Sequence, residues 1–336
     1  MLCVLRVAIV GCGPIGNTHA RQYVANPDCT LVAVCDIRRD RAEATAAKTG
    51  ARAYFDLAEM LRSEDIDAVS VCTAGTENGG DHYVPARQCL EAGKHVLVEK
   101  PLCNELAPAK ELVRLAAERG LLLGVDLNHR YVPPADRALA WVREGRIGEP
   151  VLCNMELWID NPNETSPWFH LRALHSHSID VMRFFCGDVR RVQAFLGHSS
   201  KRTIWSNCVI NLEFESGCLG ALFGSYEAAP RHGIERLELL GNAGRIVLDN
   251  VFERLELYPH GGDEVVTVRA GMMGGGPHSF EDTFRHRLRQ WVADVSAGGP
   301  VSGSGEEGLK ALAVVEAAII SFNQRRIVEL SELLPE

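Results

Sequence analysis

Residues 5–16 read Leu-Arg-Val-Ala-Ile-Val-Gly-Cys-Gly-Pro-Ile-Gly, an apolar run that enters a turn with three glycines. The run predicts a buried strand, and the pattern after it predicts a helix. In such a unit, Gly11 permits the tight turn, Gly13 lets the backbone approach a pyrophosphate, and Gly16 lets the helix pack close to the sheet. The first amides of that helix then face the phosphates. The remaining predicted cofactor contacts in this turn are Pro14 and Ile15.

A carboxylate follows the second apolar run, 31–35. This residue, Asp36, stands 20 positions after Gly16. A carboxylate there accepts hydrogen bonds from ribose hydroxyls and repels a 2′-phosphate, which favours NAD as the cofactor. Arg38 lies close by and could hold a 2′-phosphate, so NADP remains the alternative.

The first part of the chain alternates short apolar runs with helical patterns. This alternation predicts an α/β Rossmann domain over residues 1–126, with a parallel, doubly wound sheet covered on both faces. The predicted strands are 5–10, 31–35, 69–73, 95–99 and 121–125, and the predicted helices are 18–25, 40–48, 83–92 and 105–119.

The pattern changes after residue 131. Residues 127–305 predict an α+β domain with a large open, mostly antiparallel sheet, because many segments alternate apolar and polar residues. A helix in the final segment, 306–336, is expected to pack back on the Rossmann domain. Residues 271–277 are either a flexible connector or an active-site lid. The predicted elements are helices 133–143, 179–185, 281–295 and 306–324, and strands 151–159, 189–196, 205–214, 219–226, 235–239, 245–249, 254–258 and 265–268.

Composition excludes several classes of protein. The 336 residues suffice for two domains, and the net charge of −9 disfavours a nucleic-acid or anionic-membrane partner. No apolar run is long enough to span a membrane, and the first residues lack a secretory pattern, so we expect a cytoplasmic protein. The 11 cysteines include no Cys-x-x-Cys pair, which predicts reduced thiols and no metal site.

Lys100 ends the apolar run 95–99, in the segment Glu-Lys-Pro at 99–101. A lysine at the carboxyl end of a parallel strand lies where such sheets bind ligands. Burial and the positive nicotinamide would lower its pKa and make a neutral amine accessible. The amine could then take the proton of a substrate hydroxyl as hydride leaves for the cofactor.

Three segments resemble the Gfo/Idh/MocA oxidoreductases, and inositol and sugar dehydrogenases in particular. They are the glycine turn at 11–16, Glu-Ala-Gly-Lys-His-Val-Leu-Val-Glu-Lys-Pro-Leu at 91–102, and His-Ser-Ile-Asp at 177–180. The resemblance implies oxidation of a secondary hydroxyl on a sugar, sugar derivative or cyclitol, or the reverse reduction. It also implies a cis peptide before Pro101, and self-association through the open sheet face as a homodimer or homotetramer.

The resemblance makes His177 the second catalytic candidate, sharing a proton relay with Lys100. The sequence predicts that His177 opens a helix, with Asp180 three residues later on the same face to orient it. One departure concerns Ala173, which stands where polyol-oxidising members carry an aspartate. Either His175 or Arg172 could take that role, or Arg172 could bind an acidic substrate.

A second departure follows Thr73, where the family's short turn becomes Thr-Ala-Gly-Thr-Glu-Asn-Gly-Gly-Asp-His at 73–82. The resemblance places this loop beside the nicotinamide, so four extra residues could reshape the substrate pocket. It also assigns Arg130 to substrate or cofactor, with a structural ion pair as the alternative. Further predicted cofactor contacts are Thr73, Ala74, His82, Glu99 and Lys100, and further predicted substrate contacts are Trp158, Asn161 and Trp168.

Two other functions remain open. Some family members oxidise a hydroxyl transiently, eliminate or hydrolyse, and reduce again with the same NAD, which makes them lyases or glycosidases. A non-catalytic nucleotide-sensing protein is the third hypothesis, and Lys100 and His177 argue against it.

Overall fold

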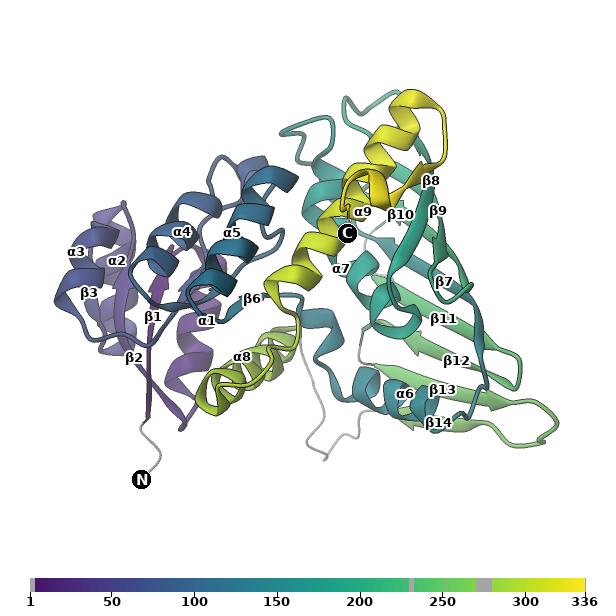
Figure 1. Ribbon diagram of the computed structural model, residues 1–336, viewed down its shortest axis with the longest axis horizontal. Coiled ribbons are helices and arrows are strands. Elements are labelled where there is room, and N and C mark those ends of the chain that lie inside the picture. The colour runs from purple at the N-terminus through teal and green to yellow at the C-terminus, as the bar shows by residue number, and fades with distance from the viewer. Residues whose placement is uncertain (1–3, 230–232, 252, 270–279, 336) are drawn as a thin grey trace. The chain divides into compact units, whose positions relative to one another are not determined.

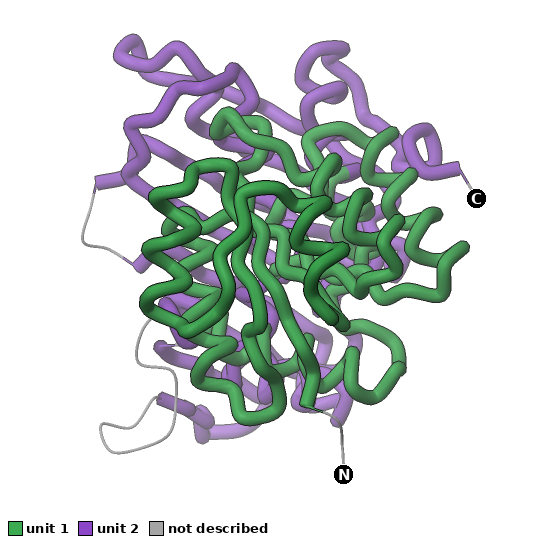
Figure 2. The backbone as a smooth tube through the Cα atoms, turned by 90° about the vertical axis from the view of Figure 1, so that its left-hand side faces the viewer, with its two compact units in different colours: residues 1–127, 283–312 green, residues 128–282, 313–336 purple. Residues whose placement is uncertain are grey.

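The computed structural model describes residues 4–229, 233–251, 253–269 and 280–335. They divide into two compact units (Figure 2): unit 1 is 1–127 with 283–312, and unit 2 is 128–282 with 313–336. The connector or lid expected at 271–277 lies outside the described residues. Within the described ranges, every helix is too short or too polar to span a lipid bilayer.

Unit 1 contains the predicted parallel sheet (Figure 1), with strand order β3-β2-β1-β4-β5-β6 and parallel pairing throughout. This confirms the doubly wound α/β prediction. Its strands are β1 (Leu5–Val10), β2 (Cys29–Cys35), β3 (Arg52–Tyr54), β4 (Ala68–Val71), β5 (His95–Val98) and β6 (Leu123–Val125). The helices that connect them are α1 (Pro14–Val24), α2 (Arg39–Thr49), α3 (Leu57–Ser63), α4 (Tyr83–Glu91) and α5 (Leu106–Glu118).

Side chains of β1 divide between two apolar clusters. Ala8 and Val10 join the cluster that contains residues of α3, α4 and α5. Val7 and Ile9 point to the other face and pack with residues of α1 and of α8 (Glu281–Ala297). Successive side chains of a strand face opposite sides, so a continuous apolar run indicates that both sides are covered.

The predicted domain boundary at 305 differs from the division in the structure, because α8 from Thr283 onward belongs to unit 1. The physical reason is its apolar stripe, which packs on the side chains of β1 and β2. The helix α9 (Gly305–Gln324) is divided, with its residues up to Leu312 in unit 1. The α8 residues that form the stripe are Leu288, Trp291, Val292 and Val295.

Unit 2 contains a nine-stranded sheet in the order β14-β13-β12-β11-β7-β10-β9-β8-β15. Every paired neighbour is antiparallel except β7 with β10, which confirms the mostly antiparallel prediction. The strands are β7 (Pro150–Trp158), β8 (Val189–Gly197), β9 (Asn207–Phe214), β10 (Leu219–Ser225), β11 (Glu235–Gly241), β12 (Gly244–Asp249), β13 (Arg254–Pro259), β14 (Val266–Arg269) and β15 (Val328–Glu329).

One face of this sheet is covered and the other is open. Alternate residues of β9, starting at Cys208, are buried, and the residues between them are exposed or partly exposed. The helix α7 (Phe169–Cys186) packs on β7 and β10, and α6 (Pro133–Arg143) packs on β12 and β13.

The helix α7 begins ten residues before the predicted start at 179, so His177 lies inside it and does not open it. Residues 169–178 carry three histidines, two serines and an arginine, which obscure the helical apolar pattern. Most of these side chains are nevertheless buried, because Phe169 and Leu174 pack with Leu157 of β7. Tertiary burial determines the helix here, and weak local propensity does not prevent it.

Candidate functional site

The glycine turn leaves room at the start of α1. A Cβ on Gly16 would lie 1.8 Å from the carbonyl oxygen of Gly11, and Gly11 itself has a φ of 92°. A Cβ on Gly13 would meet no atom within 4 Å. Gly13 is also the N-cap of α1 and offers no side chain to the first amides of the helix. The space beside Gly13 therefore suits a phosphate group held by backbone N–H groups.

Asp36 joins the turn to the end of β2. Its Oδ2 accepts a hydrogen bond from the Cys12 amide at 2.7 Å, and its Oδ1 accepts one from the Arg38 amide at 2.8 Å. A carboxylate has further lone pairs, so Asp36 can still accept from ribose hydroxyls. The Arg38 guanidinium lies 2.7 Å from Oδ2 of Asp40, and both side chains are exposed.

Lys100 lies at the same edge of the sheet as the glycine turn, because β1, β4 and β5 are parallel neighbours. The Lys100–Pro101 peptide is cis, as the resemblance implied. Burial lowers the pKa of the Lys100 amine, while the carboxylates of Glu99 and Asp126 act in the opposite direction. The site therefore holds a lysine whose neutral form is more accessible than usual.

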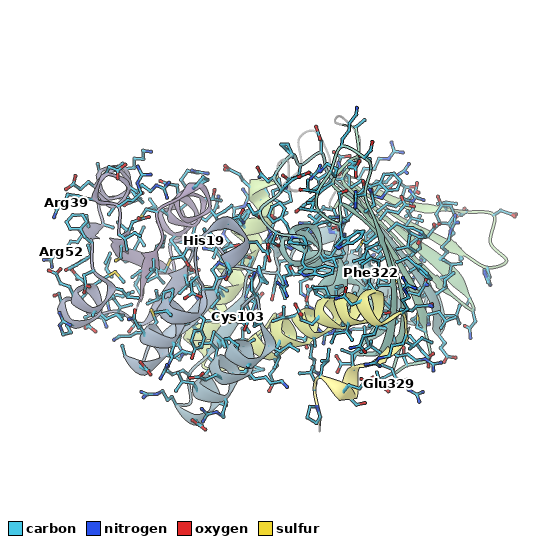
Figure 3. The ribbon with its side chains drawn as sticks, turned by 90° about the horizontal axis from the view of Figure 1, so that it is seen from above. His19, Arg39, Arg52, Cys103, Phe322 and Glu329 are labelled. Carbon is cyan, nitrogen blue, oxygen red and sulfur yellow. The ribbon has the colours of Figure 1, made fainter. Side chains whose placement is uncertain are left out.

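A buried cluster of one imidazole and two carboxylates adjoins Lys100. Nε2 of His19, on α1, lies 3.1 Å from Oε1 of Glu99 and 3.0 Å from Oδ2 of Asp126. Burial raises the pKa of Glu99 to about 7. Burial acts against the charged form of His19, but nearby Cys72 and the two carboxylates hold its pKa well above the usual range. Figure 3 labels His19.

The sequence analysis missed His19 and Asp126 as members of this site. Two signals were present, since His19 follows Gly16 by three residues and Asp126 directly follows the predicted strand 121–125. A carboxylate at that position shares the edge on which parallel sheets bind ligands.

The loop after β4 is held by His82. Its Nε2 lies 2.9 Å from the carbonyl oxygen of Thr73, and its Nδ1 lies 2.7 Å from that of Pro101. A Cβ on Gly80 would lie 2.0 Å from the carbonyl oxygen of Ala74, so the loop folds tightly on itself. The structure thus brings Thr73, Ala74 and His82 to the edge that carries Lys100.

In unit 2, His177 stacks on His129, with ring centroids 4.1 Å apart and planes at 10°. Nδ1 of His129 lies 2.7 Å from Oε2 of Glu235, and all three side chains are buried. His129 and Glu235 were not predicted as site residues. Their separation of 106 residues leaves no local pattern to detect.

Asp180 binds Arg130 within unit 2. The Arg130 Nε donates to Oδ2 of Asp180 at 2.7 Å, and Nη2 donates to Oδ1. Both side chains are buried. For Arg130, the structure supports the alternative of a structural ion pair. For Asp180, it reveals a partner that the sequence analysis did not assign.

Two predicted substrate contacts have structural partners. His175 has no exposed surface, so the structure contradicts its assignment to substrate in place of the missing carboxylate. The cause is the inward direction of this side chain, toward Cys208 of the sheet. Nε of Arg172 lies 3.0 Å from Oε1 of Glu316, on α9.

The two tryptophans predicted to contact substrate lie in different parts of unit 2. Trp158 follows Leu157, which packs against α7, so strand alternation directs Trp158 to the open face of the sheet. There it lines a hollow of about 580 Å³ with Arg236 and Arg254. Its predicted contact with substrate stays a prediction. Trp168 is the N-cap of α7, and its ring is edge-on to that of Phe322.

Comparison with known proteins agrees with this arrangement. Residues 5–127 match the family described as an oxidoreductase family with an NAD-binding Rossmann fold, and residues 136–247 match the GFO/IDH/MocA C-terminal domain. A myo-inositol 2-dehydrogenase of Thermotoga maritima is 28% identical over 351 residues, covering 98% of this chain and 100% of its own. A D-apiose dehydrogenase of Paraburkholderia graminis is 27% identical, covering 98% and 90%.

A crystal structure of an NAD-binding oxidoreductase from Klebsiella pneumoniae superimposes with a TM-score of 0.87 at 25% identity, covering 97% of this chain and 98% of its own. The glycine turn, the lysine at the end of β5 and the strands β7 to β11 of the open sheet lie in the two matched segments. The chain therefore belongs to the GFO/IDH/MocA family of oxidoreductases.

Proposed function

We propose that this protein oxidises a secondary hydroxyl of a sugar, sugar derivative or cyclitol, with Lys100 and His177 sharing the proton that leaves the hydroxyl. The observation that carries the proposal is the position of Lys100, at the carboxyl edge that also holds the glycine turn. Its lowered pKa supports a neutral amine that accepts a proton.

The residues of unit 1 fit a dinucleotide. The open space at Gly13 would receive the pyrophosphate, and Asp36 would accept from the adenosine ribose. The pairing of Arg38 with Asp40 supports NAD over NADP, because that guanidinium already has a carboxylate partner. Bound NAD⁺ would supply the hydride acceptor.

Within unit 2, the pair His129–Glu235 supports a positioning role toward His177. Glu235 orients the His129 ring, and the stacked rings restrict how His177 can turn. The names of both relatives, a myo-inositol 2-dehydrogenase and a D-apiose dehydrogenase, indicate polyhydroxylated substrates. They support a neutral polyol or sugar as the substrate class.

The second candidate is a transient-redox lyase or glycosidase that retains its NAD. Ala173 favours it, because the carboxylate of polyol-oxidising members is missing at that position. A third reading, a nucleotide sensor without activity, has no support beyond the Rossmann fold.

The test is NADH formation, followed by absorbance, across inositols, aldoses, uronic acids and amino sugars, with NAD⁺ and NADP⁺ in parallel. The proposal predicts turnover with at least one of these substrates and a preference for NAD⁺. No turnover, with NAD still bound to the purified protein and a modified sugar product, would support the lyase or glycosidase. No turnover and no product would support the sensor.

We also propose a homodimer or homotetramer that forms through the open sheet face. Large apolar side chains on this face are exposed, and such surfaces favour association. The exposed apolar residues are Trp158, Phe195, Val209, Leu219 and Phe223. Sedimentation of the wild type and of Phe223→Lys tests this, since the variant should dissociate.

The ten described cysteines are all free and buried, which supports a reducing, cytoplasmic location.

A further inference from the structure

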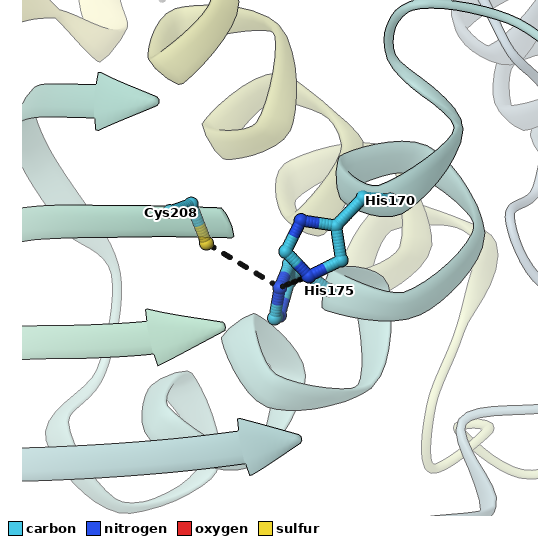
Figure 4. A group of neighbouring side chains, drawn as sticks. All are labelled: His170, His175 and Cys208. Atoms are coloured by element: carbon cyan, nitrogen blue, oxygen red, sulfur yellow. Dashed lines mark hydrogen bonds between the residues drawn. The ribbon is translucent and has the colours of Figure 1, made fainter. Parts of the chain in front are cut away.

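Three side chains with metal-binding atoms converge in the interior of unit 2. Figure 4 shows His170 and His175, both from α7, pointing toward each other and toward Cys208 of β9. Nε2 of His175 lies 3.0 Å from Nε2 of His170 and 3.4 Å from Sγ of Cys208. The three atoms all lie within 4.8 Å of one another.

Two donor atoms of this cluster compete for the same ring nitrogen. A ring nitrogen of histidine has a single in-plane position, occupied by either a proton or a lone pair. Nε2 of His175 nevertheless faces two neighbours, the His170 nitrogen and the Cys208 sulfur. One shared cation would satisfy all three atoms, because each could direct a lone pair at it.

The surroundings prepare His175 for this role. Its Nδ1 lies 3.0 Å from Oγ of Ser178, an oxygen that can accept the Nδ1 proton and so leave the lone pair on Nε2. A hydrogen bond of this kind on the second ring nitrogen is typical of metal-binding histidines. Both rings are buried.

Gly224 keeps the cluster close to the sheet. A Cβ at this position would lie 2.1 Å from Nε2 of His175 and 2.7 Å from Sγ of Cys208. Any side chain on β10 here would therefore displace two of the three donor atoms. Because Gly224 has no side chain, α7 approaches the sheet closely enough for the two histidines to contact Cys208.

We propose that His170, His175 and Cys208 bind a divalent transition-metal ion of the Zn²⁺ class, which ties the first half of α7 to β9. Two imidazoles and one thiolate suit a borderline-soft cation and not Mg²⁺ or Ca²⁺. On binding, the Cys208 thiol loses its proton to solvent and the sulfur forms the metal bond. Water could complete a tetrahedral site.

This proposal reverses the expectation of no metal site. That expectation rested on zinc-motif spacing. The spacing here is uninformative, because the histidines are five positions apart and Cys208 follows His175 by 33 positions. The site also accounts for His175 without a substrate. All three side chains are buried, so the ion would lie inside unit 2.

The experiment is titration of the full-length, chelator-treated protein with Co²⁺, followed by competition with Zn²⁺. We expect one Co²⁺ per chain, a thiolate-to-cobalt charge-transfer band, and displacement by Zn²⁺. Cys208→Ser should lose the band, and Ser178→Ala should weaken binding by about 10- to 100-fold. Cys153→Ser is the matched control, because Cys153 is also a buried strand cysteine of this sheet, and it should keep the band.

NAD binding by unit 1 and circular dichroism report whether each variant is folded. If Cys208→Ser fails to fold, His170→Gln replaces it, and loss of stoichiometric binding is then the expected result. The proposal is overturned if the wild type binds neither ion stoichiometrically. It is also overturned if the band survives in the folded Cys208→Ser or disappears equally in Cys153→Ser.

Discussion

The Asp180 carboxylate accepts a hydrogen bond from Nε of Arg130 at 2.7 Å, and neither side chain is exposed to solvent beyond a few per cent. This pair joins α7 to the short 3₁₀ helix η2 (Asn128–Arg130), at the start of unit 2. A buried charge that has lost its partner destabilises the folded state strongly, whereas the intact pair adds little net stability.

Replacing Asp180 by Asn should therefore destabilise the protein by about 3–5 kcal/mol, since it leaves the Arg130 guanidinium buried without its counter-charge. Thermal unfolding measures the effect. Glu118→Gln is the control, because Glu118 pairs with Arg114 within α5 and both side chains are more than half exposed, so its loss should cost less than about 1 kcal/mol. Equal losses in the two variants would contradict this account.

Gly13→Ala should leave the melting temperature unchanged and weaken NAD⁺ binding by at least about tenfold, an affinity loss of roughly 1.4 kcal/mol. The added methyl meets no protein atom within 4 Å, but it enters the space assigned to the pyrophosphate. Calorimetric titration with NAD⁺ tests this. Gly197→Ala, also open, is the control and should change neither property. Unchanged NAD⁺ affinity in Gly13→Ala would place the cofactor elsewhere.

Asp36→Asn should reduce the preference for NAD⁺ over NADP⁺ by about 10- to 100-fold, the effect of losing a hydrogen bond to a charged acceptor. Asn retains one acceptor oxygen but removes the charge that repels a 2′-phosphate. The ratio of kcat/KM for the two cofactors measures this preference. An unchanged ratio would mean that Asp36 serves only to hold the Cys12 and Arg38 amides.

The activity should rise with pH through a pKa below 10.5, because burial lowers the pKa of Lys100 and only the neutral amine accepts a proton. The same shift makes the stability contributed by Lys100 present above pH 10.5 and lost as the pH falls through the folded pKa. Since the Glu99 carboxylate opposes the shift, Glu99→Gln should move the pH–activity curve to lower pH.

The profile of kcat/KM against pH measures this displacement. Glu105→Gln is the control, because Glu105 is exposed at the start of α5 and should leave the curve unchanged. A curve that Glu99→Gln leaves in place, or moves to higher pH, would exclude this electrostatic effect on Lys100.

The sequence was sufficient for the parallel sheet, because continuous apolar runs such as residues 5–10 indicate burial on both faces. It was insufficient for β3, whose three residues are too few to show a period, although Asp56 does signal the start of α3 by capping the Glu59 amide. It also failed to identify the start of α7, where burial overrides local propensity.

The residues of the candidate site likewise divide into those that the sequence predicts and those that it does not. The glycine turn and Lys100 could be predicted, because each depends on residues adjacent in the chain. The contacts of His19 with Asp126 and of His129 with Glu235 could not, because 107 and 106 residues separate these partners. The direction of Trp158 follows from strand alternation, which turns its side chain away from the face that carries Leu157.

The central claim is that Lys100 carries the proton when hydride leaves the substrate. It is tested most directly by single-turnover NADH formation in the wild type, Lys100→Met and Lys110→Met, with NAD⁺ affinity measured in each. Lys110 is an exposed lysine of α5 and serves as the control. The account predicts a rate about 100- to 10,000-fold lower in Lys100→Met alone, with NAD⁺ affinity retained. An unchanged rate in Lys100→Met would contradict it.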